Sequence, residues 1–263
     1  MVSRARSKPD SSSGPIVVGV DGCKGGWFAV SRDLSSGRIQ AKLFPRFEGI
    51  MNEWMPVIIA VDIPVGLSSD EKPRGCDKQA RATLGARGVS VFSAPNRQAL
   101  TASDYADACA RNRAATANAQ APENGRAISQ QAFHLIKKIK EVDAFVRDVA
   151  HARIRIFEVH PELSFMALRN QYQAQEAGGL ALSKHAPPGR AVRLALLQQA
   201  FGGDVDHVLD DRTVRTSRQA SRDDLLDAFA ALWSAQRIHD QSAIALRDTL
   251  ARDEHGIEMA IHY

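Results

Sequence analysis

Residues 16–27 read Ile-Val-Val-Gly-Val-Asp-Gly-Cys-Lys-Gly-Gly-Trp, and this stretch decides the fold. It begins with an apolar, mostly β-branched run that ends at Asp21, the pattern of a strand buried on both faces. The glycines after Asp21 indicate a turn. A carboxylate at the end of such a strand needs a partner, because burying an unpaired charge costs several kcal/mol. The stretch therefore predicts a central strand that delivers one acid to the edge of a sheet.

Strand and helix patterns alternate outward from this strand. Residues 27–31 and 38–44 predict two more strands, joined by a turn into an antiparallel meander. The nearly all-apolar stretch 57–63 predicts a strand in a parallel arrangement, with Asp62 near its end. The other predicted elements are a strand at 153–159, a loop at 171–188, and helices at 47–54, 76–84, 99–119, 129–150, 163–169, 189–201 and 221–240. This order predicts an α/β fold: a ribonuclease-H-like mixed five-stranded sheet, an antiparallel meander then parallel strands, with helices on both faces.

Length and composition fit one large domain. The chain has 263 residues, of which 44% are hydrophobic, enough for a sizeable core. We predict a polar, disordered tail at residues 1–14 and a single domain at residues 15–263, with helical insertions around 68–150 and 163–205. No apolar run has the length of a membrane span, and the three cysteines form neither a disulfide framework nor a zinc pair. We expect a cytoplasmic protein without membrane contact, and an Ala-rich helical surface compatible with a homodimer.

Acids at two strand ends and on the last predicted helix are the candidate catalytic residues. Asp21 and Asp62 each end an apolar strand, where open α/β sheets place ligands. Asp224 and Asp227 are three apart and share a helix surface. Each acid has a structural explanation on its own, such as a turn or the capping box of Ser221 with Asp224. Together they favour a site for Mg²⁺ or Mn²⁺, because clustered carboxylates raise one another's pKa unless a cation lies between them.

Glu158 and His160 follow the last predicted strand. Glu158 is a further candidate catalytic residue, as a metal ligand or a substrate contact. His160 is a candidate general base, ligand or substrate contact. With no second His at ligand spacing, a histidine that simply satisfies its hydrogen bonds is at least as good an explanation.

The net charge gives little indication of the substrate. The first 14 residues contribute half of the formal charge of +4, so the net charge of the rest of the chain is small. Local clusters of basic residues are therefore a better guide to the substrate than the net charge. Most basic residues on helices are expected to be merely solvated, and the low aromatic content of 6% argues against a broad base-stacking platform. Residues near the acid-bearing strand ends and in one later cluster remain as candidate substrate-binding residues: Lys24, Arg74, Arg81, Arg87, Arg97, Gln130, His160, Lys184 and Arg190.

Short blocks of sequence stand in order between residues 16 and 239. They are Gly19–Trp27, Val61–Leu67, Arg74–Asp77 with Ala80 and Arg81, Gly88–Arg97, Ser129–Ala132, Glu158–Phe165, Lys184 with Gly189 and Arg190, and Asp224–Ala231. Together they resemble the domain-of-unknown-function 429 family of predicted nucleases with a ribonuclease-H-like fold. The resemblance implies that fold and, as an expectation, nuclease activity on DNA or RNA.

The four aspartates are also distantly similar in layout to RuvC-type Holliday-junction resolvases. Those enzymes carry acids on the first and fourth strands and two Asp three apart on the last helix. The resemblance implies two-metal hydrolysis of phosphodiester bonds, with Asp21 bridging two Mg²⁺ and Asp62, Asp224 and Asp227 completing their shells. This chain departs from that pattern in having Asp rather than Glu on the fourth strand, and Glu158 has no clear equivalent.

Three other functions are compatible with the sequence. The modest charge of the domain suits a hydrolase of a small phosphorylated molecule. A phosphotransferase of the sugar-kinase and actin-like class shares the fold. That class needs two copies of the fold around a nucleotide cleft, whereas this chain has the length for one. The sequence also lacks a phosphate-binding Gly-x-x-x-x-Gly-Lys-Ser/Thr loop. A non-catalytic nucleic-acid-binding module is the third. The residues do not distinguish DNA, RNA and a small phosphoester as substrate.

Overall fold

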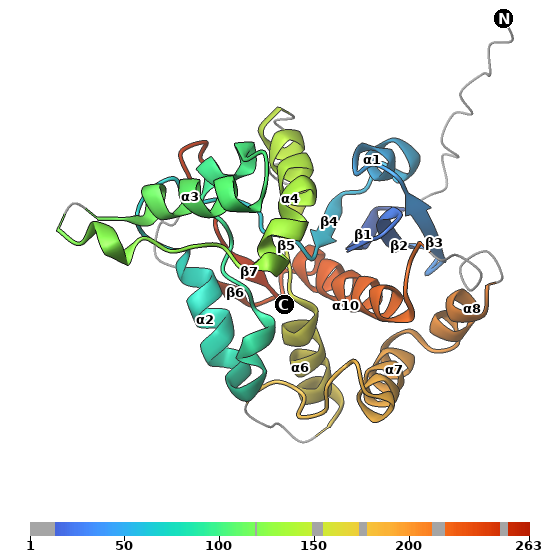
Figure 1. The fold of residues 1–263 in the computed structure, drawn as a ribbon. Coiled ribbons are helices and arrows are strands. Elements are labelled where there is room, and N and C mark those ends of the chain that lie inside the picture. Colours follow the sequence, from blue (N-terminus) through green and yellow to red (C-terminus); the bar gives the residue numbers. More distant parts are fainter. Residues whose placement is uncertain (1–13, 119, 149–154, 174–177, 212–218, 248–251) are drawn as a thin grey trace, which may run out of the picture.

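A five-stranded mixed sheet forms the centre of the chain in a computed structural model that describes residues 14–118, 120–148, 155–173, 178–211, 219–247 and 252–263 (Figure 1). Its order is β3-β2-β1-β4-β5, with β1 antiparallel to β2 and parallel to β4, and with β4 parallel to β5. The strands are β1 (Ile16–Cys23), β2 (Gly26–Asp33), β3 (Ile39–Phe44), β4 (Ile58–Val61) and β5 (Ile156–Glu158). This arrangement confirms the predicted α/β, ribonuclease-H-like fold class.

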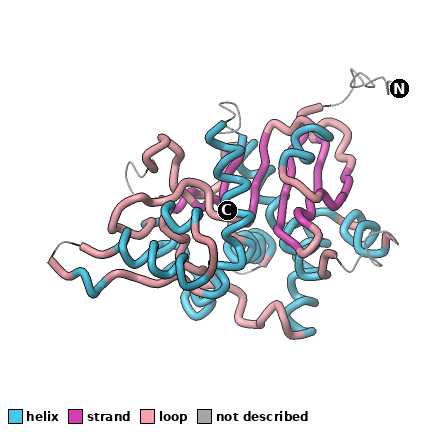
Figure 2. Tube along the Cα trace, turned by 45° about the horizontal axis from the view of Figure 1, so that its top comes forward, coloured by secondary structure: helices cyan, strands magenta, loops and turns pink. Residues whose placement is uncertain are grey.

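Helices cover both faces of the sheet (Figures 1 and 2). Alternate residues of β1 point to opposite faces, so Val18 and Val20 pack in one core and Val17 packs in the other. The first face is covered by α1 (Glu48–Trp54) and α4 (Gln130–Asp148). The second is covered by α6 (Pro161–Tyr172), α7 (Pro187–Phe201), α8 (Asp204–Asp210) and α10 (Arg222–His239). The segments between β4 and α4 contain α2 (Gly75–Leu84), α3 (Tyr105–Thr116), and the short 3₁₀ helices η1 (Gly85–Ser90), η2 (Arg97–Thr101) and η3 (Pro122–Asn124).

Helix α10 lies directly against the backbone of β1 at Gly19. A Cβ atom on Gly19 would lie 2.0 Å from the backbone nitrogen of Leu232 and 2.2 Å from the carbonyl oxygen of Ala228. The small residues Ala228 and Ala231 are fully buried in this contact, which lets the helix approach closely. The approach brings Asp227, one residue before Ala228, toward the end of β1.

Some predicted elements were wrong in their bounds. The predicted helix at 99–119 is two elements, η2 and α3, because Asp104 has an extended backbone and its side chain accepts a hydrogen bond from the amide of Asp107 to begin α3. The predicted loop at 171–188 overlaps the last residues of α6 and the first residues of α7. The sequence patterns also missed α8 and the short strands β6 (Ala245–Leu246) and β7 (Ile261–His262).

Several predictions lie wholly or partly outside the described residues. The predicted tail does so except for Gly14, and so do the start of the strand predicted at 153–159, the ends of the helices predicted at 99–119 and 129–150, and residues 174–177 of the predicted loop. Among the helices that are described, none is long and apolar enough to cross a membrane.

Replacement of Gly19 tests the contact between α10 and β1. We expect Gly19→Ala to lower the free energy of unfolding by about 3 kcal/mol or more, because the new methyl group meets backbone atoms that cannot rotate away. Urea denaturation followed by circular dichroism measures this change. Gly203→Ala is the matched control: its Cβ meets nothing within 4 Å and its φ is −70°, so a neutral to slightly stabilising effect is expected. Equal effects of the two variants would contradict the proposed role of the contact.

Candidate active site

The carboxyl ends of β1 and β4 open into a cavity of about 270 Å³, called here the acid cavity. The parallel register pairs Val20 with Val61, and the amide of Asp62 donates to the carbonyl of Val20 at 3.0 Å. Asp21 and Asp62 are therefore neighbours at the sheet edge. The residues that line the cavity are Asp21, Gly22, Asp62, Arg87, Ser90, Phe92, Gln131, Leu135, His160, Pro161, Glu162, Lys184, His185, Asp224 and Asp227.

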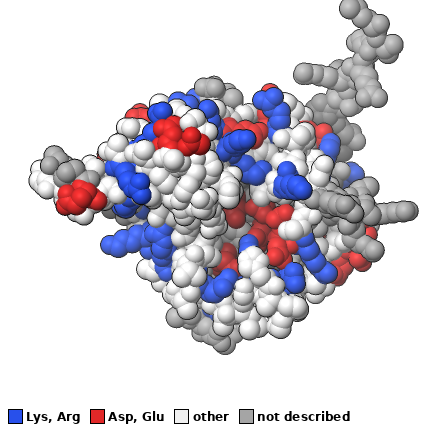
Figure 3. Space-filling model, viewed as in Figure 1, with Lys and Arg blue, Asp and Glu red and all other residues white. Residues whose placement is uncertain are grey.

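Helix α10 brings the other two aspartates to the same cavity. Its first turn is the predicted capping box: the Ser221 hydroxyl accepts from the amide of Asp224, and the Asp224 carboxylate accepts from the amide of Ser221 at 2.7 Å. Asp224 thus caps the helix and also lines the cavity. Asp227, one turn further on, is buried. In the space-filling view, acidic side chains gather where α10 lies in Figure 1, with Lys and Arg side chains around them (Figure 3).

Burial and mutual repulsion govern the protonation of these carboxylates. Burial raises the pKa of Asp21 well above its ordinary value, and the charges of Asp62, Asp227 and Asp224 raise it further. Burial also raises the pKa of Asp62 and of Asp227 to about 6, despite the opposing effect of Lys184. Strongly shifted carboxylates that share one cavity are typical of functional sites.

Lys184 is the cation closest to the cluster. Its Nζ donates to Oδ2 of Asp227 at 2.5 Å, and its side chain is 28% exposed. Burial alone would lower the pKa of Lys184, but Asp227 and the neighbouring aspartates raise it above its ordinary value. The ammonium group therefore stays charged and offsets part of the negative charge in the cavity.

A buried ion pair holds the wall that carries Lys184. Arg193 of α7 donates from one nitrogen to both carboxylate oxygens of Glu162, at 2.8 and 2.7 Å. Its other terminal nitrogen donates to the carbonyls of Leu182 and Gly189, both at 2.9 Å. Arg193 thereby ties α6, α7 and the segment before Lys184 together. Neither Arg193 nor Glu162 was predicted as a site residue, although an arginine among the apolar residues of a helix indicates a buried partner.

Glu158 lies in a separate buried network and does not line the acid cavity. Its two carboxylate oxygens accept from Arg74 at 2.6 and 2.8 Å, and one also accepts from the amide of Val65 at 2.8 Å. Arg74 also donates to Asp77 at 2.6 Å. Burial works against the charge of Arg74, but Asp77 and Glu158 raise its pKa well above the ordinary value. Both Glu158 and Arg74, proposed from the sequence as site residues, are thus engaged in joining β4, β5 and α2.

The predicted substrate-binding residues divide into two groups. Three of them line the acid cavity: Arg87, His160 and Lys184. The rest lie outside it: Lys24, Arg74, Arg81, Arg97, Gln130 and Arg190. Arg97 is bound by Asp143 and Asp253, while Arg81 donates to the carbonyl of Val91 and the hydroxyl of Ser93.

The environment of His160 favours the neutral imidazole. Burial lowers the pKa of His160, and its Nε2 lies 3.4 Å from the carbonyl oxygen of Ser90. Its Nδ1 is buried and has no hydrogen-bond partner among the described residues. The ring nitrogen Nδ1 is therefore a buried polar atom whose hydrogen-bonding capacity is unused by the described residues.

A family model described as a protein of unknown function, DUF429, matches residues 19–251. The chain belongs to the DUF429 family. The matched range of this DUF429 protein contains all four aspartates of the acid cavity together with Lys184. Comparisons with curated proteins and with solved structures gave no match.

Replacement of Arg74 distinguishes a structural residue from a substrate contact. We expect Arg74→Met to lower the free energy of unfolding by about 3–5 kcal/mol, because it leaves the carboxylates of Glu158 and Asp77 buried without their partner. The control Arg81→Met removes two hydrogen bonds from a half-buried arginine and is expected to cost about 1 kcal/mol. Thermal and urea denaturation measure both changes. A fully stable Arg74→Met protein would show that the network does not hold the sheet and α2 together.

Proposed function

We propose that this DUF429 protein is a metal-dependent phosphodiesterase, specifically a nuclease, that hydrolyses phosphodiester bonds at the acid cavity. The observation that carries the proposal is the convergence of Asp21 and Asp62 from neighbouring parallel strands with Asp224 and Asp227 from α10. Folding has to overcome the repulsion among these carboxylates, and Lys184 offsets only part of it. Such an arrangement is expected where a divalent cation and a phosphate group bind.

The chemistry of the donor set suits Mg²⁺ or Mn²⁺, because both cations prefer hard carboxylate oxygens. With the side chains as they stand, however, no group of three or more His, Cys, Asp or Glu in the described ranges is disposed to hold a metal ion. One of the four carboxylates, that of Asp227, is already bound by the ammonium group of Lys184. A metal would have to compete with Lys184 for Asp227.

The proposed roles of the side chains follow from their positions. Asp21, Asp62, Asp224 and Asp227 would hold the metal, whose Lewis acidity favours attack on phosphorus and departure of the alkoxide. Arg87 and Lys184 lie in the same cavity and would neutralise the phosphate oxygens. Neutral His160 lines the same cavity and would contact the substrate through its ring.

A hydrolase of a small phosphorylated molecule is the second candidate. The acid cavity of about 270 Å³ has room for one phosphorylated unit and lies near the lower end of the size range of small-molecule sites. The catalytic groups would be the same, and only the substrate would differ.

Cleavage assays with Asp21→Asn test the proposed function. Labelled single-stranded, duplex and branched DNA and RNA, together with small phosphodiesters, are incubated with Mg²⁺, Mn²⁺ or EDTA. We expect metal-dependent cleavage by the wild type and a loss of about 100-fold or more in Asp21→Asn, since removal of one catalytic group costs a few kcal/mol in the transition state.

The matched control is Asp204→Asn, which removes the same charge from an exposed position on α8 and is expected to leave cleavage unchanged. Cleavage that survives in EDTA or in Asp21→Asn would contradict the assignment. Absence of cleavage with every substrate, with metal binding still dependent on Asp21, would favour a non-catalytic module.

Metal binding should depend on pH. The carboxylates must lose their protons to bind a cation, and the pKa values of Asp62 and Asp227 lie at about 6. We therefore expect Mn²⁺ affinity, measured by isothermal titration calorimetry, to rise by about tenfold or more between pH 5 and pH 7.5 and to level off above it. Lys184→Met should tighten Mn²⁺ binding, because it removes the competing cation. An affinity independent of pH would contradict binding at the acid cavity.

A further inference from the structure

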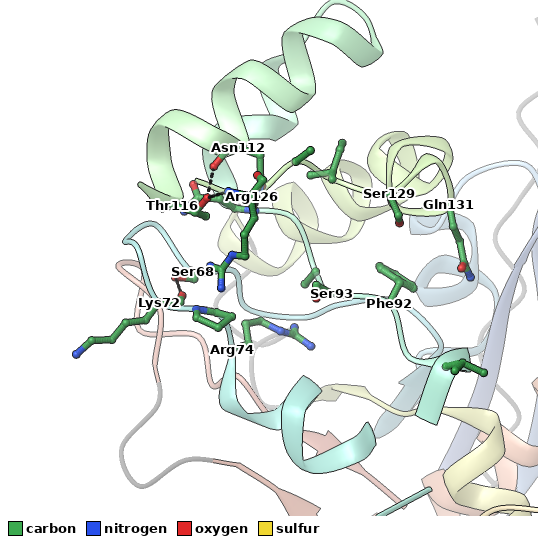
Figure 4. Close-up of a pocket in the computed structure, with 16 residues that line it drawn as sticks. Ser68, Lys72, Arg74, Phe92, Ser93, Asn112, Thr116, Arg126, Ser129 and Gln131 are labelled. Carbon is green, nitrogen blue, oxygen red and sulfur yellow. Dashed lines mark hydrogen bonds between the residues drawn. The ribbon is translucent and has the colours of Figure 1, made fainter. Parts of the chain in front are cut away.

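A second, larger pocket of about 330 Å³ lies beside the acid cavity (Figure 4). It is formed by the segments on either side of α2 and η1, by α3 and by the start of α4. Phe92 and Gln131 line both this pocket and the acid cavity, so the two spaces adjoin each other. A ligand that occupies the second pocket therefore lies next to the acid cavity.

The second pocket has the opposite charge from the acid cavity. Its lining contains Lys72, Arg74 and Arg126 and no aspartate or glutamate. Arg74 is neutralised by its buried carboxylates, and the side chain of Lys72 points away from the space in Figure 4. Arg126 points inward in that view, and one terminal nitrogen donates to the carbonyl of Glu71 at 3.0 Å. The other N–H groups of this exposed side chain have no hydrogen-bond partner among the described residues and can donate to an anion.

Hydrogen bonds between distant segments hold the wall around Arg126 in place. The buried side chain of Asn112 accepts from the amide of Asn96 at 2.7 Å and donates to the carbonyl of Arg126 at 2.6 Å. The amide of Arg126 donates to the hydroxyl of Thr116 at 2.8 Å. The pocket is thus formed without a ligand, which lowers the entropy cost of binding one.

Phe92 adds an aromatic surface at the boundary between the two spaces. Its side chain is half-buried, and it packs against the core on the α4 side of the sheet. Ile128 and Ala94 extend the apolar part of the pocket, while Ser93 and Gln131 supply polar groups. Phe92 and Arg126 line the same pocket from different sides, and an aromatic ring together with an arginine can hold an unpaired base and its phosphate.

We propose that the second pocket binds one nucleotide unit of the substrate, with the base against Phe92 and a phosphate at Arg126. This inference rests on the proposed function, since it places that unit next to the phosphodiester held in the acid cavity. The size of the pocket suits a single nucleotide, and a base pair would have to open before one of its bases could enter. The nucleotide is either part of an unpaired strand or a free small nucleotide.

Equilibrium binding in EDTA tests the pocket without any cleavage. A fluorescein-labelled single-stranded tetranucleotide is titrated by fluorescence anisotropy, and unlabelled AMP, GMP, CMP and UMP compete for it. We expect Arg126→Ala and Phe92→Leu each to weaken binding by about tenfold, from loss of a charge-assisted hydrogen bond and of base stacking. The control Arg113→Ala removes the same charge from an exposed position on α3 outside the pocket, and its effect should stay below about twofold.

The outcomes separate the two proposals. If an unlabelled mononucleotide displaces the probe as effectively as the unlabelled tetranucleotide does, the ligand of the pocket is a free small nucleotide. If the mononucleotide competes much more weakly, the ligand is part of an unpaired strand. Binding unchanged in folded Arg126→Ala and Phe92→Leu proteins, or no nucleotide binding by the wild type, overturns the pocket assignment. Asp21→Asn should bind at least as tightly as the wild type in EDTA, because it removes a negative charge. Loss of cleavage in Asp21→Asn alone would leave the proposed function standing even if the pocket fails.

Discussion

The contact between α10 and β1 at Gly19 is the constraint on which the rest of the structure depends. Because Gly19 has no side chain, the backbone of the helix lies directly against the strand. The same approach buries Ala228 and Ala231 and brings Asp227 to the level of Asp21. A wider spacing would separate the carboxylates of the helix from those of the sheet, so packing and site geometry share one cause.

The acid cavity introduces an electrostatic cost that the surrounding structure limits in two ways. Lys184 places one positive charge on Asp227, and Arg193 neutralises Glu162 while it holds the segment before Lys184. The residual negative charge is the property that makes the cavity suitable for a cation. Buried ion pairs contribute little net stability. Here they determine which carboxylates of the cavity have a cationic partner and which do not.

Charge also distinguishes the acid cavity from the second pocket that adjoins it. The acid cavity presents carboxylates at the sheet edge, whereas the second pocket presents Arg126 and an aromatic ring within a preformed wall. The insertions between β4 and α4 build the second pocket, and Phe92 and Gln131 connect it to the first. Under the proposed function, the insertions would contribute substrate recognition, and the central sheet with α10 would contribute the chemistry.

Local periodicity and turn residues report directly on backbone structure, so the strand pattern, the central acid-bearing strand and the capped last helix could be predicted from the sequence. The sequence also indicated Asp21 and Asp62, since acids at the ends of apolar strands are conspicuous, and Asp224 with Asp227, which are three apart on the last predicted helix. Tertiary structure alone decided that Glu158 and Arg74 neutralise each other, that Lys184 binds Asp227, and that Arg193 and Glu162 form part of the site. The physical reason is that a charged residue in the sequence does not specify its partner. Ion pairing between residues tens of positions apart is settled only when the sheet and helices pack.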